Sequence, residues 1–99
     1  MFARVSTYQV EDDARLTDGF KRATGPLDDV AGFAGAFFLL DSDGRKAMSI
    51  TLWDDEGALE ASAEMGNRLR QGAVGDGAGS IGSVENYEVV LTAGRVVAA

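Results

Sequence analysis

A hairpin at the centre of the chain is the feature that most limits how this sequence can fold. Two apolar segments, 36–40 and 46–53, are joined by a polar turn sequence that ends at Gly44. Glycine can adopt the positive φ that tight hairpin turns require. The second segment alternates between more and less polar residues with the period of two that is typical of strands. These segments are therefore predicted to be adjacent antiparallel strands.

One strand and one helix are predicted on each side of this hairpin. Residues 2–10 and 84–91 have the pattern of strands, and residues 11–24 and 54–70 carry apolar side chains at helical spacing after acidic starts. The Gly-Pro pair at 25–26 is expected to end or loosen the first helix there. The order β-α-β-β-α-β predicts a ferredoxin-like α+β fold with an antiparallel sheet and both helices on one face. The buried faces of the helices are expected at Leu16, Phe20, Ala23 and Leu27 in the first and at Ala58, Ser62, Met65 and Leu69 in the second.

The other face of this sheet has no helix to cover it. Neither face of the first strand is strongly polar, with Phe2, Tyr8 and Val10 on one and Ala3, Val5 and Thr7 on the other. An uncovered apolar face needs a partner, and a homodimer that closes two sheets over a shared cavity supplies one. The sequence therefore predicts a homodimer.

Length and charge limit the size of the protein and its partners. Residues 1–99 are expected to form a single domain, with a core over 1–91 and a C-terminal tail over 92–99. The net charge of −7 and the lack of a basic stripe make nucleic acid and anionic membranes unsuitable partners. The longest apolar run, 33–40, is too short to span a bilayer, and no signal-peptide pattern precedes it. A cytoplasmic location is expected.

The chain contains neither cysteine nor histidine, which limits its chemistry more than any other aspect of composition. Without cysteine there are no disulfides, thiolate nucleophiles or zinc–cysteine sites. Without histidine the chain lacks the commonest metal ligand, the usual haem ligand and the usual general base at neutral pH. No metal and no cofactor are expected.

Two motifs that resemble ligand-binding sequences have simpler explanations. Residues 77–82 match the dinucleotide fingerprint GxGxxG, but they follow a helix and precede a strand, the reverse of the required order. They are predicted to belong to a glycine-rich loop over 72–82, with a lid over a cavity mouth as the functional alternative. The acidic turn that ends at Gly44 lacks most of the ligands of a calcium loop. The acidic runs at 11–13 and 54–56 are expected to be helix starts.

A few polar and aromatic residues on the predicted strands are candidates for contact with a ligand. Trp53 ends the third strand, where it serves either as a packing anchor or as a cavity wall that stacks on an aromatic ligand. Arg4 is a charge inside a strand and needs water, an acidic partner or a ligand. The candidate ligand-binding residues are Trp53, Arg4, Ser49, Tyr8 and Tyr87. No catalytic residue is assigned.

The segment from Ser49 to Leu59 resembles the strand–tryptophan–acidic-helix signature of antibiotic biosynthesis monooxygenase-type domains. Gly32-Phe33, just before the second strand, is similar to the start of that strand in the family. The resemblance implies a dimeric α+β barrel. It also implies one of several activities, among them cofactor-free oxygenation of aromatic polyketides, oxygenation of quinols and haem degradation.

The resemblance favours some branches of this family over others. The haem-degrading branch uses a histidine, a helix tryptophan and a strand-one asparagine. Ser62 and Gly72 stand where that tryptophan and histidine would fall, and strand one has no asparagine, so this branch is not expected. The polyketide-oxidising branch keeps the tryptophan, here Trp53. Its asparagine four residues earlier and its tyrosine six residues later correspond to Ser49 and Leu59.

Two functions therefore remain open. The first is a cofactor-independent monooxygenase that binds a small aromatic or quinol-like molecule in a dimer cavity, where the protein positions the substrate against O₂ and stabilises an anion. The alternative is a non-catalytic dimeric barrel protein that binds a small apolar ligand or partner. The family resemblance favours the first, and the lack of a recognisable acid–base set favours the second.

Overall fold

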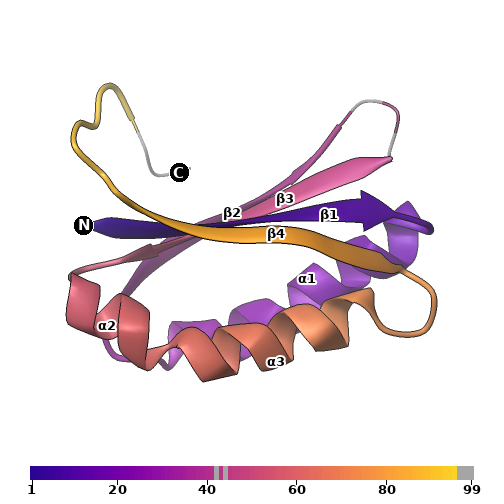
Figure 1. The fold of residues 1–99 in the computed structure, drawn as a ribbon, viewed down its shortest axis with the longest axis horizontal. Coiled ribbons are helices and arrows are strands. Elements are labelled where there is room, and N and C mark those ends of the chain that lie inside the picture. Colours follow the sequence, from indigo (N-terminus) through magenta and orange to yellow (C-terminus); the bar gives the residue numbers. More distant parts are fainter. Residues whose placement is uncertain (42, 44, 96–99) are drawn as a thin grey trace.

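An antiparallel sheet with all of its helices on one face forms the fold (Figure 1). The computed structural model describes residues 1–41, 43 and 45–95. The strands are β1 (Phe2–Val10), β2 (Phe33–Leu40), β3 (Lys46–Trp53) and β4 (Gly79–Glu88), in the order β2-β3-β1-β4. The helices are α1 (Asp13–Asp28), α2 (Glu56–Ala61) and α3 (Ala63–Val74). The predicted ferredoxin-like α+β fold is confirmed.

The central hairpin and the first strand have the predicted arrangement. β2 pairs antiparallel with β3, and β3 pairs antiparallel with β1, which lies between β3 and β4. Before the turn, the side chain of Asp41 accepts a hydrogen bond from the backbone N–H of Arg45 at 3.0 Å. The expected positive φ of Gly44 falls outside the described residues.

Helix α1 continues past the point where the sequence predicted its end. Asp12 caps its start by accepting a hydrogen bond from the backbone N–H of Arg15, but the helix runs through Gly25 and Pro26 to Asp28. Proline removes one backbone hydrogen bond, and this loss is offset because the next residue, Leu27, is buried against Trp53. The prediction that the Gly-Pro pair ends the helix was therefore wrong.

The predicted second helix is two helices that meet at Ser62 and end beyond residue 70, at Val74. The Ser62 hydroxyl donates a hydrogen bond to the Leu59 carbonyl at 2.7 Å, the local bonding by which serine competes with helix hydrogen bonds. Ser62 is buried as predicted. Sequence analysis missed Leu59 and Ala73, which are also buried.

The glycine-rich segment is not a loop over 72–82 but is divided between the end of α3, a short turn and the start of β4. β4 begins at Gly79 and ends at Glu88, three residues earlier than predicted. A side chain at Gly79 would collide with the backbone carbonyl of Gln9, so glycine is needed for the edge strand to approach β1. Only a short turn separates α3 from β4, and Gly77 in that turn has a φ of +78°. The predicted length of the loop was therefore wrong.

Two clusters of side chains fill the space between the sheet and the helices. One is built around Tyr8 and Phe20, whose rings meet edge to face at 5.2 Å, and the other around Leu27 and Trp53. Within the described residues, no helix is long and apolar enough to cross a membrane.

The opposite face of the sheet has no helix over it (Figure 1). Phe37 and Leu39 of β2 are exposed there, and Met48, Ile50 and Leu52 of β3 are partly exposed. We call this surface the open face. Its apolar character agrees with the sequence expectation, and its covering by a second copy remains a prediction.

Candidate functional site

A small cavity lies between the helix-covered face of the sheet and helices α1 and α3. Its volume is about 40 Å³. Aromatic side chains from three elements form part of its wall: Phe20 of α1, Phe38 of β2 and Trp53 of β3. The cavity is therefore mainly apolar, and its few polar groups stand out.

Two hydroxyl groups in this cavity form a hydrogen-bonded pair. Tyr8 of β1 and Ser49 of β3 are both buried, and their oxygen atoms are 2.9 Å apart. Burial raises the pKa of Tyr8, while the hydrogen bond to Ser49 and the nearby charge of Arg70 act in the opposite direction. Tyr8 is consequently a neutral hydrogen-bonding group at neutral pH.

Arg4 contributes a buried charge from the same side of β1. Its exposed fraction is 5%. Its Nη1 donates to the Ser62 hydroxyl at 3.0 Å and its Nη2 to the Leu59 carbonyl at 2.7 Å, so it is fixed to the junction of α2 and α3. Burial lowers the pKa of Arg4, and the positive charge of Arg70 lowers it further.

Arg70 of α3 brings a second guanidinium to the cavity. Its Nε is buried and has no hydrogen-bond partner. Burial lowers the pKa of Arg70, with Tyr8 acting in the opposite direction. Within residues 1–41, 43 and 45–95, neither Arg4 nor Arg70 forms an ion pair with a carboxylate. Positive charge in this cavity is therefore not neutralised by the part of the chain that the structure describes.

Gly66 makes it possible for both arginines to reach the same place. A Cβ atom on Gly66 would lie 3.0 Å from Nη1 of Arg4 and 3.2 Å from Nη1 of Arg70. Both guanidinium groups thus converge on the side of α3 at which the side chain is missing. A glycine inside a helix normally destabilises it relative to alanine, and here its absent side chain gives the guanidinium groups room.

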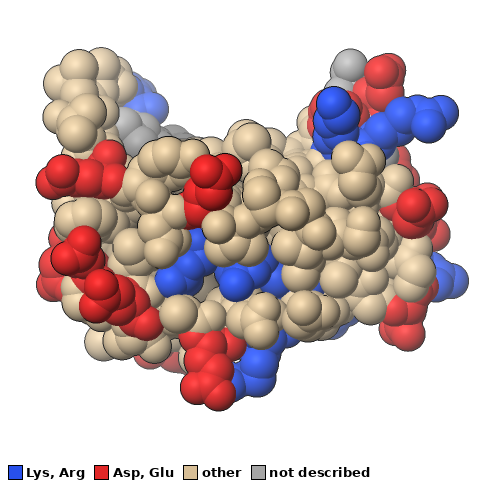
Figure 2. Space-filling model, viewed as in Figure 1, with Lys and Arg blue, Asp and Glu red and all other residues tan. Residues whose placement is uncertain are grey.

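The positive site lies in a molecule whose net charge is negative. Figure 2 shows basic atoms in a hollow between β4 and α3, mostly among uncharged residues, with one acidic side chain just above the hollow and others around the edge of the view. The chain as a whole carries a net charge of −7. An anion that reaches this hollow meets a local charge opposite to that of the whole molecule.

Trp53 is a packing anchor that also lines the cavity, and its stacking on an aromatic ligand stays a prediction. It is 1% exposed, packs against Leu27 and Leu59, and also lines the cavity. Its indole N–H donates a hydrogen bond to the Thr51 hydroxyl at 3.0 Å, which fixes the ring.

The structure brings together four of the five candidate residues. Arg4, Tyr8, Ser49 and Trp53 all line the cavity on the helix-covered side, within one chain, and not the open face at which a shared dimer cavity was expected. Tyr87 lies apart from them. It pairs with Ala3, so it projects from the open face, and 51% of it is exposed. Tyr87 is therefore not part of this site.

Sequence analysis did not select Arg70, the last residue of the predicted second helix. The available signal was the spacing Ser62, Gly66, Arg70, which puts two small residues and an arginine on one side of a helix. Small residues in such a row leave room for the arginine to turn inward.

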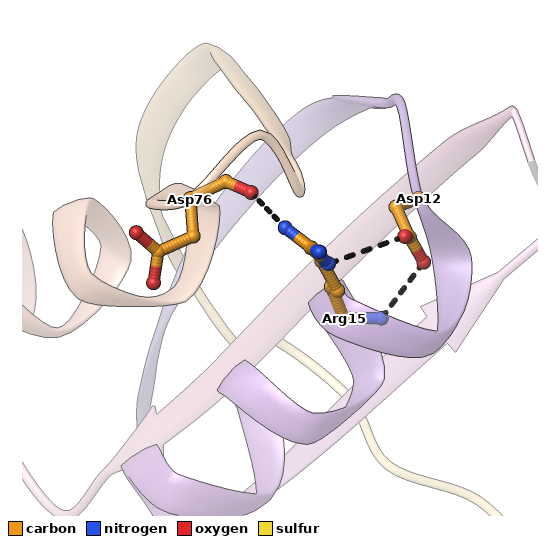
Figure 3. A network of polar contacts seen from close by, with 3 residues as sticks. All are labelled: Asp12, Arg15 and Asp76. Atoms are coloured by element: carbon orange, nitrogen blue, oxygen red, sulfur yellow. Dashed lines mark hydrogen bonds and ion pairs between the residues drawn. The ribbon is translucent and has the colours of Figure 1, made fainter.

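A second polar cluster, at the surface, joins the start of α1 to the turn after α3 (Figure 3). Arg15 forms an ion pair with Asp12 at 3.4 Å and donates to the backbone carbonyl of Asp76 at 2.5 Å. This contact ties the short turn to the body of the protein. The tie and the strand from Gly79 onward leave no free loop to act as the lid considered from sequence.

No metal centre accompanies these polar groups within the described residues. No cluster of three or more acidic, cysteine or histidine side chains that could hold a metal ion occurs among them. The arrangement provides hydrogen bonding, positive charge and aromatic walls.

Several solved structures share this fold at low sequence identity. SnoaB of Streptomyces nogalater, a cofactor-independent oxygenase, superimposes with a TM-score of 0.75 at 16% identity, over 92% of this chain and 94% of its own. The haem degrader MhuD of Mycobacterium tuberculosis has a TM-score of 0.75 at 20% identity, over 95% of this chain and 100% of its own. The monooxygenase from the ActVA-Orf6 gene of Streptomyces coelicolor, solved with Nanaomycin D, has a TM-score of 0.65 at 20% identity, over 98% of this chain and 92% of its own.

These likenesses confirm that the chain has the fold of antibiotic biosynthesis monooxygenase-type proteins. No protein-family model matches the sequence, and no curated protein sequence does.

Proposed function

We propose that this protein is a cofactor-independent monooxygenase that acts on a small aromatic or quinol-like molecule. The observation that carries the proposal is a cavity with aromatic walls in which two arginines have no counter-ion among the described residues. An electron-rich aromatic can itself reduce O₂ once it has lost a proton, and positive charge stabilises the anion that forms. SnoaB, which has the same fold, is a cofactor-independent oxygenase.

The reaction can be written without any added redox group. In an anthrone the reacting carbon is a CH₂ group, and loss of one proton gives an aromatic enolate that transfers electrons to O₂. One oxygen atom becomes the carbonyl oxygen on that carbon. The other leaves as water with the two hydrogens of the CH₂ group. The protein contributes position and electrostatics to this sequence.

Each cavity residue has a defined part in this scheme. Arg4 and Arg70 bring positive charge to the cavity, where it stabilises the anion that forms, and the Nε of Arg70 is a donor without a partner in the protein. The neutral Tyr8 hydroxyl, held by Ser49 at 2.9 Å, donates to or accepts from a substrate oxygen. Trp53 supplies a flat, fixed wall for the ring.

The cavity must enlarge to hold such a substrate. Its volume of about 40 Å³ is far below the several hundred Å³ of typical ligand pockets. The hollow between β4 and α3 in Figure 2 is a route from solvent to the basic groups. Substrate binding on this route moves α3 away from β4, with the junction at Ser62 as the hinge.

We further propose that the open face pairs with the open face of a second copy. Phe37 and Leu39 are large apolar residues that a single chain leaves exposed to water, and closing them stabilises both copies. Sedimentation should give twice the chain mass of 10.4 kDa at micromolar concentration. A particle of 10.4 kDa would contradict the dimer.

Oxygen uptake tests the proposed reaction. Purified protein, without added metal or flavin, is incubated in air with a panel of anthrones and hydroquinones, and uptake is compared with the uncatalysed rate. Uptake should fall at least about 100-fold in Arg70→Met, the loss typical of one electrostatic group, and stay unchanged in Arg68→Met. Arg68 lies on the same helix, is exposed, and pairs with Glu64 at 3.5 Å.

The opposite result supports the non-catalytic alternative. If no member of the panel is consumed faster than in buffer, while some raise the unfolding temperature in a saturable way, the protein binds these molecules without turnover. The oxygenase proposal is then rejected.

A further inference from the structure

The two arginines of the cavity differ in what their donors already bind. Arg4 is 5% exposed and is fixed by the Ser62 hydroxyl and the Leu59 carbonyl. Arg70 has a buried Nε with no acceptor. Arg4 therefore acts as a fixed background charge, and Arg70 offers the donor that a ligand can use.

We propose that the cavity selects an aromatic carboxylate, whose carboxylate group binds Arg70 while its ring lies against the aromatic wall at Phe38 and Trp53. The proposal rests on the proposed function and names the substrate class of that same site. A guanidinium offers two parallel N–H groups, one of them at Nε, and their geometry matches a planar carboxylate.

A permanent negative charge fits this site better than a neutral ring does. Two guanidinium groups that lie close to the same point, Gly66, destabilise the unliganded protein because their charges repel and because Arg4 and the Nε of Arg70 are buried. A neutral ligand would remove further water and leave both charges in place. A carboxylate offsets the positive charge of the two arginines and also accepts a hydrogen bond from the Nε of Arg70.

The remaining walls restrict the rest of the ligand. Apart from the arginines and a few hydroxyl groups, the cavity is apolar, which disfavours a strongly hydrated phosphate dianion. The present volume of about 40 Å³ means that a single ring needs the least displacement of α3. The inferred class is therefore a compact, single-ring carboxylate.

Gly66 is the specificity-determining position in this arrangement. The guanidinium groups of Arg4 and Arg70 both lie close to the position on α3 where a side chain is missing. A methyl group would stand 3.0 Å from Nη1 of Arg4 and 3.2 Å from Nη1 of Arg70, so one or both must shift by a few tenths of an ångström.

Calorimetric titration with benzoate and benzamide tests the inference, because the two probes have nearly the same shape and differ in charge. Wild-type protein should bind benzoate at least about tenfold more tightly than benzamide at neutral pH, a difference of about 1.4 kcal/mol. The preference should disappear in Arg70→Met and persist in Arg68→Met, which removes the same charge from the outer side of the same helix.

Gly66→Ala gives a second variant with an independent readout. Alanine favours helix more than glycine does, so the fold should be retained or strengthened while the benzoate preference is lost. Circular dichroism and the urea midpoint verify the fold before titration. If Gly66→Ala kept the full preference, the convergence of the two arginines would not be the basis of selection.

Failure of this inference can be told from failure of the proposed function. Equal binding of benzoate and benzamide, or binding of neither, overturns the carboxylate class even if neutral hydroquinones are oxidised. A clear benzoate preference without any oxygen uptake leaves the carboxylate site standing and rejects the oxygenase. Lowering the pH through about 4, where a carboxylate gains its proton, should abolish the preference.

Discussion

The helix-covered face of the sheet and its open face are built from the same strands, but the buried polar side chains of β1 lie on the helix-covered face. Arg4, Ser6 and Tyr8 point toward the helices and are buried, between Phe2 and Val10 at the two ends of the strand. The alternate residues Ala3 and Val5 point to the open face. A strand that only shielded a core would place apolar residues at the three central positions that face the helices.

The buried polar groups indicate that the helix-covered face has a role beyond stabilising the fold. Burying Arg4 and Tyr8 costs free energy that a purely structural core avoids. An apolar open face costs nothing further once a second copy covers it. The buried polar groups thus suit ligand binding, and the apolar open face suits association. Substitutions on the two faces should therefore have different consequences.

The largest expected difference between the faces concerns stability. Trp53→Ala should lower the free energy of unfolding by about 3–5 kcal/mol, because it empties a site that is 1% exposed. Leu39→Ala on the open face, where the side chain is 46% exposed, should lower it by less than about 1 kcal/mol in dilute protein. Urea unfolding followed by far-ultraviolet circular dichroism measures both. Similar losses for the two variants would show that the faces are equally buried.

The next largest effect concerns association. Ile50→Asp places a charge near the middle of the open face, and in a symmetric dimer both copies bring that charge into the interface. The dimer dissociation constant should rise at least about 100-fold, while the monomer keeps its helical and strand content. Ala14→Asp, on the exposed side of α1, is the matched control. Sedimentation that is unchanged by Ile50→Asp would rule out this face as the interface.

A smaller effect compares the two tyrosines of the chain at alkaline pH. Burial raises the pKa of Tyr8, whereas the pKa of Tyr87, which is solvent-exposed, is raised by its hydrogen bond and charge interaction with Glu85. The folded state favours the protonated form of Tyr8, so this group contributes fully to the free energy of unfolding below the ordinary tyrosine pKa of about 10. The contribution is lost as the pH rises above that value, by at most about 1.4 kcal/mol per pH unit.

Urea midpoints around and above pH 10 measure this loss. Tyr8→Phe should reduce the fall in stability, and Tyr87→Phe should reduce it less, because solvent screens the exposed interaction of Tyr87 with Glu85. The lowered pKa values of Arg4 and Arg70 act in the opposite sense, so each variant is compared with wild type at the same pH. An equal effect of the two tyrosine variants would contradict the burial of Tyr8 on the helix-covered face.

Sequence patterns were sufficient for the fold and for most of the site, for identifiable reasons. The hairpin, the order of strands and helices along the chain, and the position of Trp53 follow from short-range signals: alternation, a turn sequence and acidic helix starts. Arg4 was selected because a charge within a strand is unusual. These features depend on residues that are close in sequence.

Features that depend on distant contacts were not predictable in the same way. Helix α1 passes Pro26 because Leu27 packs on Trp53, and the break at Ser62 is accompanied by a hydrogen bond from Arg4. The register of β1, which decides that Arg4 and Tyr8 face the helices, is set by pairing with β3 and β4. Alternation shows which residues of a strand share a face. Because both faces of β1 carry apolar residues, alternation does not show which face the helices cover.

The smallest expected difference lies between two pairs of hydroxyl groups, one on each face. On the helix-covered face, the hydroxyl oxygens of Tyr8 and Ser49 are 2.9 Å apart, and on the open face those of Thr7 and Ser83 are 2.7 Å apart. Ser49→Ala removes a partner from the buried Tyr8 hydroxyl and should lower the free energy of unfolding by about 1 kcal/mol or slightly more. Ser83→Ala should cost less than about 0.5 kcal/mol, because the Thr7 hydroxyl is only partly buried and still accepts a hydrogen bond from the backbone N–H of residue 83 at 3.0 Å. Urea unfolding of the two variants at low protein concentration measures the difference. A larger loss for Ser83→Ala, even in the monomer, would mean that the open face is the more desolvated of the two.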